Sequence, residues 1–285
     1  MPAGPLCSYP RGMGTKMRDL WSEGLSLLRY EPTEMRIRVR HDGRELADTT
    51  KAALVWEPRR VVPSYAVPVA DLSVELVPSS GEAVPAPDGI LHPGIPFTAH
   101  SADGQSMDLL AGEKRLVGAG FRPDDTELAD YVVLDFNAFD EWLEEDQPVL
   151  SHPREPYHRV DVRRSSRTVR VELDGVALAE SSRPSFVFET GLPTRFYLPR
   201  EDIVAELEPS DLRTTCAYKG RAIYFSAGGR KNLMWSYPEP LPDARELAGL
   251  VAVYDDLVDV YVDGKLRGRP TGPVAKALQQ EFGLV

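Results

Sequence analysis

Side chains that bind or react with small molecules are concentrated in one stretch of the chain, between residues 189 and 237. Arginine and lysine bind anions, arginine by bidentate contact and lysine as a point charge. Tyrosine and tryptophan rings bind planar ligands by stacking and by cation–π contact. The stretch combines both kinds, and we predict that it forms a site for a planar or anionic ligand. The predicted ligand-binding residues are Glu189, Arg195, Tyr197, Tyr218, Lys219, Tyr224, Trp235 and Tyr237.

Each of these side chains also has a structural interpretation. Arg195 and Lys219 can pair with Glu189 and leave no charge for a ligand. Tyrosine and tryptophan are large, mostly buried residues in ordinary cores. Both interpretations stay open at the level of the sequence.

Cys216 and Lys219 are the candidates for catalysis in the same stretch. A cysteine reacts as its thiolate, which a neighbouring cation such as Lys219 or Arg195 stabilises. The five histidines of the chain all precede this stretch, so a Cys–His pair needs a residue such as His152 or His158 from outside it. A cysteine within a strand is more often a small buried apolar residue. We therefore favour an inert thiol and keep catalysis as the alternative.

The stretch belongs to the second copy of an internal repeat. Residues 38–57 align without a gap on residues 170–189, at an offset of 132. A later block beginning at Glu127 aligns on the block beginning at Glu246, at an offset of 119. The first copy therefore carries about 12 extra residues, which we place in the loop SGEAVPAPDGILHPG.

The two copies differ where the predicted site lies. Residues 80–113 of the first copy contain no Cys, Lys, Arg, Tyr or Trp. We infer that the site belongs to the second copy and that the first copy is a scaffold or lid; the alternative is that the first copy repacks around its longer loop. The residues predicted to lack a counterpart in the first copy are Cys216, Tyr218, Lys219, Tyr224 and Trp235.

The hydrophobic pattern predicts mostly β-structure. Alternating apolar residues that end in Asp-Gly, as at Asp174-Gly175, are typical of β-hairpins, and we expect another hairpin to turn at Lys219-Gly220. Two more strands are expected on either side of Asp255-Asp256. Short strands at close spacing indicate a compact sandwich or a partly open barrel. Helices are expected at residues 17–28, 139–144 and 244–249, and the C-terminal segment AKALQQEFGLV is expected to be a short helix or a fraying tail.

The repeat and the composition of the connecting segments predict the domain organisation. A disordered leader and a short helix occupy residues 1–29, and the two modules occupy 30–148 and 158–268, joined by a linker at 149–157. Residues 269–285 form a C-terminal tail.

Composition excludes several classes of function. Lys and Arg number 33 against 44 Asp and Glu, a net charge of −11, which does not favour nucleic-acid binding. Two cysteines cannot build a disulfide framework or a four-cysteine zinc site. The chain has no run of 18 apolar residues and no secretory signal, so we expect a cytoplasmic protein without a membrane partner. We expect no metal and no cofactor.

Several motifs of the second copy, in order, resemble the domain of unknown function 427 family. They are ESSR, FETGLPTRFYLPREDI, TTCAYKGRAIY and WSYP. The resemblance covers the second copy end to end and the first copy in a degenerate form; Ala217 stands where the family usually has proline. It implies a small, mainly β fold similar to the beta-tent of the thalidomide-binding domain of cereblon and of methionine sulfoxide reductase B. It implies no settled activity.

The family also carries a nucleotidyltransferase-like label. Nucleotidyl transfer of the usual kind needs clustered carboxylates for Mg²⁺ and a backbone that cradles phosphate, and the second copy has no motif for either. We predict a mainly β protein of two tandem coiled-sheet, beta-tent-like modules with few short helices, whose second module binds a small planar or anionic, nucleotide-like metabolite. The alternatives are an enzyme, by nucleotidyl transfer or Cys216 chemistry, and a structural or interaction protein.

Overall fold

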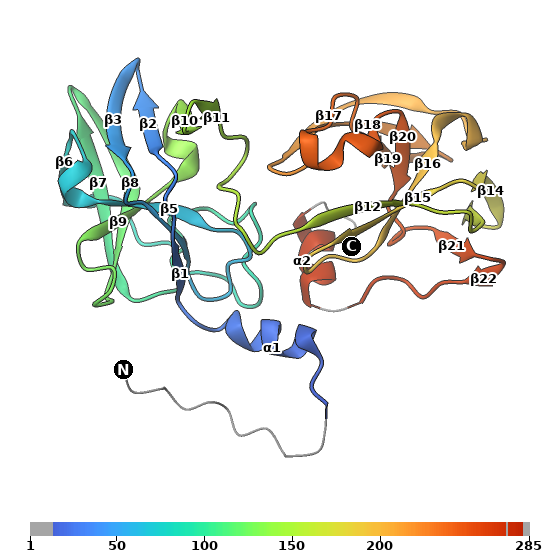
Figure 1. Cartoon of the computed structure of the whole chain (residues 1–285), viewed down its shortest axis with the longest axis horizontal. Helices are drawn as coiled ribbons and strands as arrows, with labels where there is room; N and C mark the ends of the chain where they lie inside the picture. The colour runs from blue at the N-terminus through green and yellow to red at the C-terminus, as the bar shows by residue number, and fades with distance from the viewer. Residues whose placement is uncertain (1–13, 272, 282–285) are drawn as a thin grey trace.

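The structure, a computed structural model, describes residues 14–271 and 273–281 (Figure 1). Strands β1–β11, here called the first copy, gather on one side, and strands β12–β22, the second copy, gather on the other (Figure 1). The predicted mainly β class is confirmed. Residues 1–13 of the predicted disordered leader, which include Cys7, lie outside the described residues. Residues 272 and 282–285 of the predicted tail also lie outside them.

The first copy follows a short helix, α1 (Met17–Gly24). Its elements are β1 (Arg29–Pro32), β2 (Ile37–His41), β3 (Arg44–Thr49), β4 (Ala53–Trp56), β5 (Ser64–Pro68), η1 (Val69–Asp71), β6 (Glu75–Pro78), β7 (Gly104–Ala111), β8 (Lys114–Pro123), β9 (Tyr131–Leu134), η2 (Phe136–Ala138), β10 (Glu141–Glu144) and β11 (Gln147–Pro148).

The second copy repeats this series and ends in a second helix. Its elements are β12 (Val160–Arg164), β13 (Val169–Leu173), β14 (Val176–Ser181), β15 (Ser185–Glu189), β16 (Arg195–Pro199), η3 (Arg200–Asp202), β17 (Glu208–Cys216), β18 (Gly220–Ala227), β19 (Arg230–Ser236), η4 (Pro242–Leu247), β20 (Leu250–Val253), β21 (Asp259–Val262), β22 (Lys265–Leu266) and α2 (Pro273–Glu281).

Each copy contains a seven-stranded and a four-stranded antiparallel sheet with the same strand order. The seven-stranded sheets run β1-β4-β5-β9-β8-β7-β6 and β12-β15-β16-β20-β19-β18-β17. The four-stranded sheets run β11-β10-β2-β3 and, in the same sense, β22-β21-β13-β14. The repeat seen in the sequence therefore extends through every strand. The module limits at 30–148 and 158–268 stay a prediction.

The copies differ most between the sixth and seventh strands. In the first copy β6 and β7 are joined by residues 79–103, which include the loop predicted to be inserted. In the second copy residues 217–219 join β17 to β18. We call residues 79–103 the insertion.

Asp-Gly turns fix the register of the hairpins. Asp174 and Gly175 both have positive φ, 51° and 80°, and join β13 to β14 as the sequence predicts. Asp42 and Gly43, with φ of 50° and 71°, do the same between β2 and β3. Two successive residues with positive φ match the twist of the flanking strands. The turn chemistry therefore sets the same pairing in both copies.

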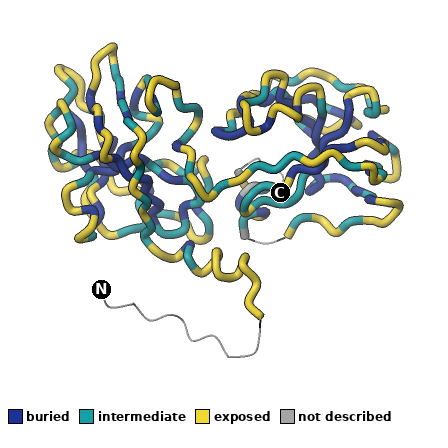
Figure 2. Tube along the Cα trace, viewed as in Figure 1, coloured by how far each residue is buried: buried dark blue, intermediate teal, exposed yellow. Residues whose placement is uncertain are grey.

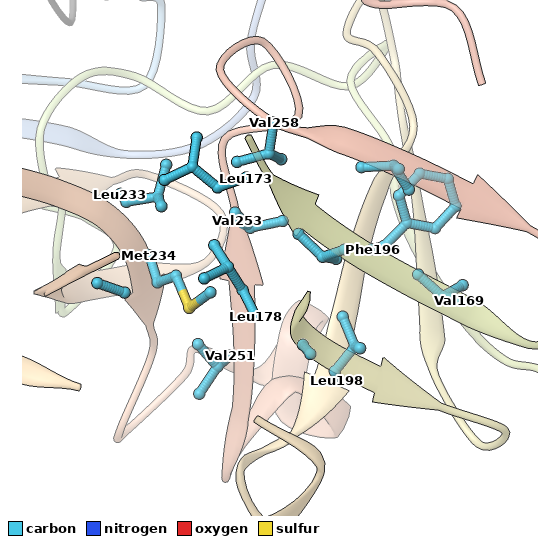
Figure 3. Packing of buried hydrophobic residues seen from close by; sticks show 14 of the residues in the cluster. Val169, Leu173, Leu178, Phe196, Leu198, Leu233, Met234, Val251, Val253 and Val258 are labelled. Atoms are coloured by element: carbon cyan, nitrogen blue, oxygen red, sulfur yellow. The ribbon is translucent and has the colours of Figure 1, made fainter. Parts of the chain in front are cut away.

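Alternation along the strands supplies the core between the two sheets. In β13 the side chains of Val169, Val171 and Leu173 are buried and alternate with partly exposed ones. They pack against residues of the seven-stranded sheet such as Phe196 and Val253 (Figure 3). Buried residues follow the sheets of each copy, whereas α1 is mostly exposed (Figure 2). Each copy therefore has a core of its own.

The helix predictions had different outcomes. At the C-terminus the short helix, rather than the fraying tail, is observed as α2 in the described residues. The first is confirmed in part as α1, which ends at Gly24 rather than at residue 28. The third is a 3-10 helix, η4. The second is wrong, because residues 141–144 form β10, which pairs with β2 and buries Trp142 and Leu143. Among the described residues, no helix has the length and apolar character needed to span a bilayer.

Candidate functional site

A cavity of about 400 Å³ opens beside the seven-stranded sheet of the second copy. Its walls also include Trp21 of α1, residues 61–63 and 90–94 of the first copy, the linker, and Val274 and Ala277 of α2. The volume falls within the range of small-molecule sites. The lining includes every residue of the predicted site, namely Glu189, Arg195, Tyr197, Cys216, Tyr218, Lys219, Tyr224, Trp235 and Tyr237.

Strand pairing produces the aromatic wall of the cavity. Tyr197, Ala252, Trp235 and Tyr224 are successive partners across β16, β20, β19 and β18. Side chains of paired residues share a face of a sheet, so the small Ala252 leaves the three aromatic rings next to one another. Tyr254, two residues beyond Ala252, joins them at 4.5 Å between ring centroids from Trp235.

Hydrogen bonds hold these rings in place. Trp235 Nε1 donates to the Tyr197 hydroxyl at 3.1 Å. The Tyr224 hydroxyl bonds Thr214 Oγ1 at 2.9 Å and lies 3.4 Å from the hydroxyl of Tyr254. Burial raises the pKa of Tyr197 and Tyr254, so both phenols are neutral at pH 7. The wall is therefore rigid, aromatic and uncharged.

Lys219 and Glu189 form a buried ion pair at one side of the cavity. Glu189 ends β15, and Lys219 lies in the turn between β17 and β18. His158 Nε2 bonds the other oxygen of Glu189 at 3.1 Å. Burial alone raises the pKa of Glu189, but the Lys219 charge and the hydrogen bonds from His158 and Lys219 outweigh burial and lower the pKa to about 2. Lys219 therefore pairs with Glu189, as the structural interpretation of its sequence position expects.

Arg195 is paired as well, although not with Glu189. Its guanidinium forms ion pairs with Asp255 and with Asp256, the latter at 2.8 Å. Both carboxylates are buried, and Asp256 also accepts a hydrogen bond from Gln279 of α2 at 2.9 Å. Because two carboxylates face one guanidinium, this group carries an excess negative charge. Neither cation of the predicted site is available to an anion without breaking a buried pair, which costs several kcal/mol.

The linker and His158, the residue that follows it, cover another side of the cavity. His158 stacks on Tyr218 with 4.2 Å between ring centroids, and the Tyr218 hydroxyl accepts a hydrogen bond from the Glu155 backbone N–H at 3.0 Å. His152 also lines the cavity, and burial lowers its pKa to about 4, so it is neutral at pH 7. Burial raises the pKa of the Glu155 carboxyl.

Cys216 lies at the end of β17, half-buried and not in a disulfide. It contacts the aromatic cluster from its edge. The structure places it on the cavity wall, two residues before Tyr218. Its reactivity stays a prediction.

The insertion fills the corresponding place in the first copy. By strand pairing, Ala66, Val133, Phe121 and Ser106 are the counterparts of Tyr197, Ala252, Trp235 and Tyr224. The imidazole of His100 stacks on Phe121 at 3.8 Å and bonds Glu57 Oε1 at 3.0 Å. The counterpart of Glu57 is Glu189.

Arg60 holds the insertion there. This buried side chain donates to the backbone oxygens of Pro96, Phe97 and Ala99 at 2.9–3.2 Å. The expectation that Trp235 has no counterpart in the first copy is wrong. Phe121, which lies just beyond residues 80–113, occupies the position that corresponds to Trp235. The replacement of Tyr197 and Tyr224 by alanine and serine leaves space that the insertion occupies.

Several contributors to the cavity were not predicted. Tyr254 directly follows β20 and lies on the same face as Ala252, two residues before it. Because side chains alternate along a strand, the sequence pattern could have predicted Tyr254 as a member of the site. Trp21 and the residues of α2 come from segments without a motif. Trp21 lies against Gly191, where an added β-carbon would be 3.3 Å from the indole ring.

In the part of the chain that the structure describes, the potential metal ligands of the cavity wall do not form a group of three. Among the described residues, the one group of at least three potential ligands is His41, Asp42 and Asp140, and none of them lines the cavity.

Comparison with known proteins agrees with the two-copy architecture. A family model described as a domain of unknown function (DUF427) matches residues 29–86 and 161–264. The second match spans β13–β21, whereas the first stops within the insertion. No curated protein matches the chain.

Proposed function

Since this chain belongs to the DUF427 family, whose description assigns no function, we propose a function from the site itself: the second copy binds a small planar metabolite in its aromatic cavity. The observation that carries the proposal is the contrast between the copies. Both copies have the same two sheets. The insertion covers the face of the seven-stranded sheet in the first copy, and a cavity of about 400 Å³ lies at the corresponding position in the second.

The lining has the composition of a binding site. Tyr224 and Trp235 line the cavity with aromatic rings, and stacking adds about 0.5–1.5 kcal/mol per aromatic pair beyond the burial of area. Hydroxyls and the buried pair supply a few fixed polar groups, as ligand pockets require. Thiol chemistry at Cys216, nucleotidyl transfer and a role as an interaction module stay predictions, since no contact in the cavity favours them over binding.

A ligand screen on the full chain tests the proposal. Planar metabolites are added singly, and binding is followed by thermal shift and by tryptophan fluorescence. A ligand at about 100 times its Kd stabilises the folded chain by about 2.7 kcal/mol.

Leu192→Trp is the blocking variant, because Leu192 lines the cavity and a larger ring there takes the space of the ligand. Leu212→Trp is the matched control, since Leu212 is 38% exposed on β17 and does not line the cavity. We expect hits that Leu192→Trp abolishes and Leu212→Trp retains. Hits that survive Leu192→Trp, or a screen of planar metabolites without any hit, would refute the proposal.

A further inference from the structure

The cations of the cavity wall are already neutralised by protein carboxylates. Lys219 pairs with Glu189, and Arg195 pairs with both Asp255 and Asp256. We propose that the ligand is a planar nitrogen heterocycle that is cationic or neutral, and that the cavity excludes anions. This inference rests on the proposed function and specifies its ligand.

The balance of charge supports a cation. Two Lys or Arg side chains, Lys219 and Arg195, line the cavity. Four carboxylates either line it or pair with one of these two, namely Glu155, Glu189, Asp255 and Asp256. Of these, Glu155 also interacts with Arg29 and His158, whereas Asp255 and Asp256 share one guanidinium. Arg154, which stacks on Tyr218 at 5.2 Å, is itself paired with Asp243. An incoming anion would have to break a buried pair, whereas a cation meets an excess of negative charge.

The aromatic wall supports the same class of ligand. The face of a tyrosine or tryptophan ring attracts cations because of its quadrupole. Arg195 already uses such a face, with its Cζ 6.0 Å from the centroid of Tyr254. Trp235 and Tyr224 line the same cavity and offer this interaction to a ligand.

The first copy contains an independent indication of the chemistry. There the insertion places a planar nitrogen heterocycle, the imidazole of His100, on the ring of Phe121, with its planes 13° from parallel. The same imidazole bonds the Glu57 carboxylate at 3.0 Å. Phe121 and Glu57 are the counterparts of Trp235 and Glu189. In the second copy Lys219 and His158 bond Glu189, and His158 stacks on Tyr218 rather than on Trp235. The first copy therefore places a planar nitrogen heterocycle on the ring that corresponds to Trp235, and Trp235 lines the cavity.

Three pyridines of one size and different charge test the inference. They are 1-methylnicotinamide, a cation; nicotinamide, which is neutral; and nicotinate, an anion. Their dissociation constants are measured on the full chain by tryptophan fluorescence at pH 7.5 and low salt, and Leu192→Trp identifies binding in the cavity. We expect the cation to bind at least about tenfold more tightly than the anion, with the neutral amide between them.

Glu155→Gln shows whether the charge of the cavity causes this order. Glu155 lines the cavity, and its carboxylate accepts a hydrogen bond from the Tyr157 backbone N–H that an amide oxygen can also accept. The variant should weaken cation binding by about threefold and strengthen anion binding. Glu246→Gln, at an exposed carboxylate of η4, makes the same change in net charge away from the cavity. It should leave the dissociation constants of the cation and of the anion unchanged.

Each outcome has a separate meaning. An anion that binds as tightly as the cation, or equal effects of the two glutamate variants, overturns the charge preference and leaves the cavity as a binding site. Absence of binding by all three pyridines up to millimolar concentration overturns the heterocycle class. The proposed function then depends on the wider screen of planar metabolites.

Discussion

Removal of the Lys219 charge tests the main electrostatic feature of the site. Methionine has nearly the length of the lysine stem, so Lys219→Met keeps most apolar contacts and leaves Glu189 without its ammonium partner. The two side chains are only 10% and 6% exposed. Removing one partner of a buried pair costs about 3–5 kcal/mol. Because His158 still bonds Glu189 at 3.1 Å, we expect the lower end of that range at pH 7.

The pH dependence follows from the pKa of Glu189. This pKa is about 2 in the folded chain against an ordinary value of 4.5, so the carboxylate stabilises the wild type above pH 4.5 and loses this contribution as the pH falls toward 2. In the variant, burial acts without the lysine and raises the pKa of Glu189, so stability falls as the pH rises through that raised value. The difference between variant and wild type is therefore largest at neutral pH and shrinks near pH 4.5.

Urea titrations monitored by circular dichroism measure the free energy of unfolding. Lys231→Met, at an exposed lysine of β19, is the matched control and should change stability by less than about 0.5 kcal/mol. Adding Glu189→Gln to Lys219→Met should recover about 2 kcal/mol, because no unpaired charge remains. A Lys219→Met chain within about 1 kcal/mol of the wild type at pH 7 would refute the reasoning, and so would a loss that is independent of Glu189.

Three further predictions concern histidine and cysteine side chains. His100→Ala should cost about 2–4 kcal/mol by opening a void beside Phe121, and added imidazole should restore part of the loss in thermal-shift assays. Burial lowers the pKa of His152 from 6.5 to about 4, so the wild type loses stability as the pH falls between these values. His152→Gln should remove up to about 3 kcal/mol of that loss, measured by urea titration at pH 7 and 4.5. Iodoacetamide should label the half-buried Cys216 of a folded Cys7→Ser chain no faster than an unactivated thiol, in keeping with the inert thiol favoured above, and a ligand in the cavity should slow this labelling by more than about threefold; equal rates with and without the ligand would contradict this.

The framework was predictable from the sequence because its determinants are local. Asp-Gly turns and period-two alternation act within a few residues, and the repeat provides a second instance of each. The helix expected at 139–144 fails for the opposite reason. Its glutamates and leucine favour a helix locally, but Trp142 is buried by pairing with Val39 of β2, far away in the sequence.

The members of the site were predictable, and the pairing of Lys219 with Glu189 was one of two open interpretations, but the partners of Arg195 were not predicted. The predicted residues come from neighbouring strands, so their convergence follows from the hairpins. The pairing of Arg195 with Asp256 joins residues 61 positions apart, and the sequence assigns Asp255-Asp256 only to a connection between strands. The expectation of an anionic ligand rested on unpaired cations, and long-range ion pairs remove that basis.

The insertion contributes to the structure of both copies. Its residues near His100 fill the place on the first copy that corresponds to the cavity, and residues 90–94 of the same insertion line the cavity of the second copy. Arg60 fixes the residues near His100 by donating hydrogen bonds to their backbone oxygens. The N–H of Leu91 bonds the backbone oxygen of Arg59 at 2.9 Å and anchors residues 90–94. The insertion therefore fills one place in the first copy and forms part of the cavity wall in the second. The first copy keeps both of its sheets and supplies residues 61–63 and part of the insertion to the cavity wall, so the cavity beside the second copy is lined by residues of both copies.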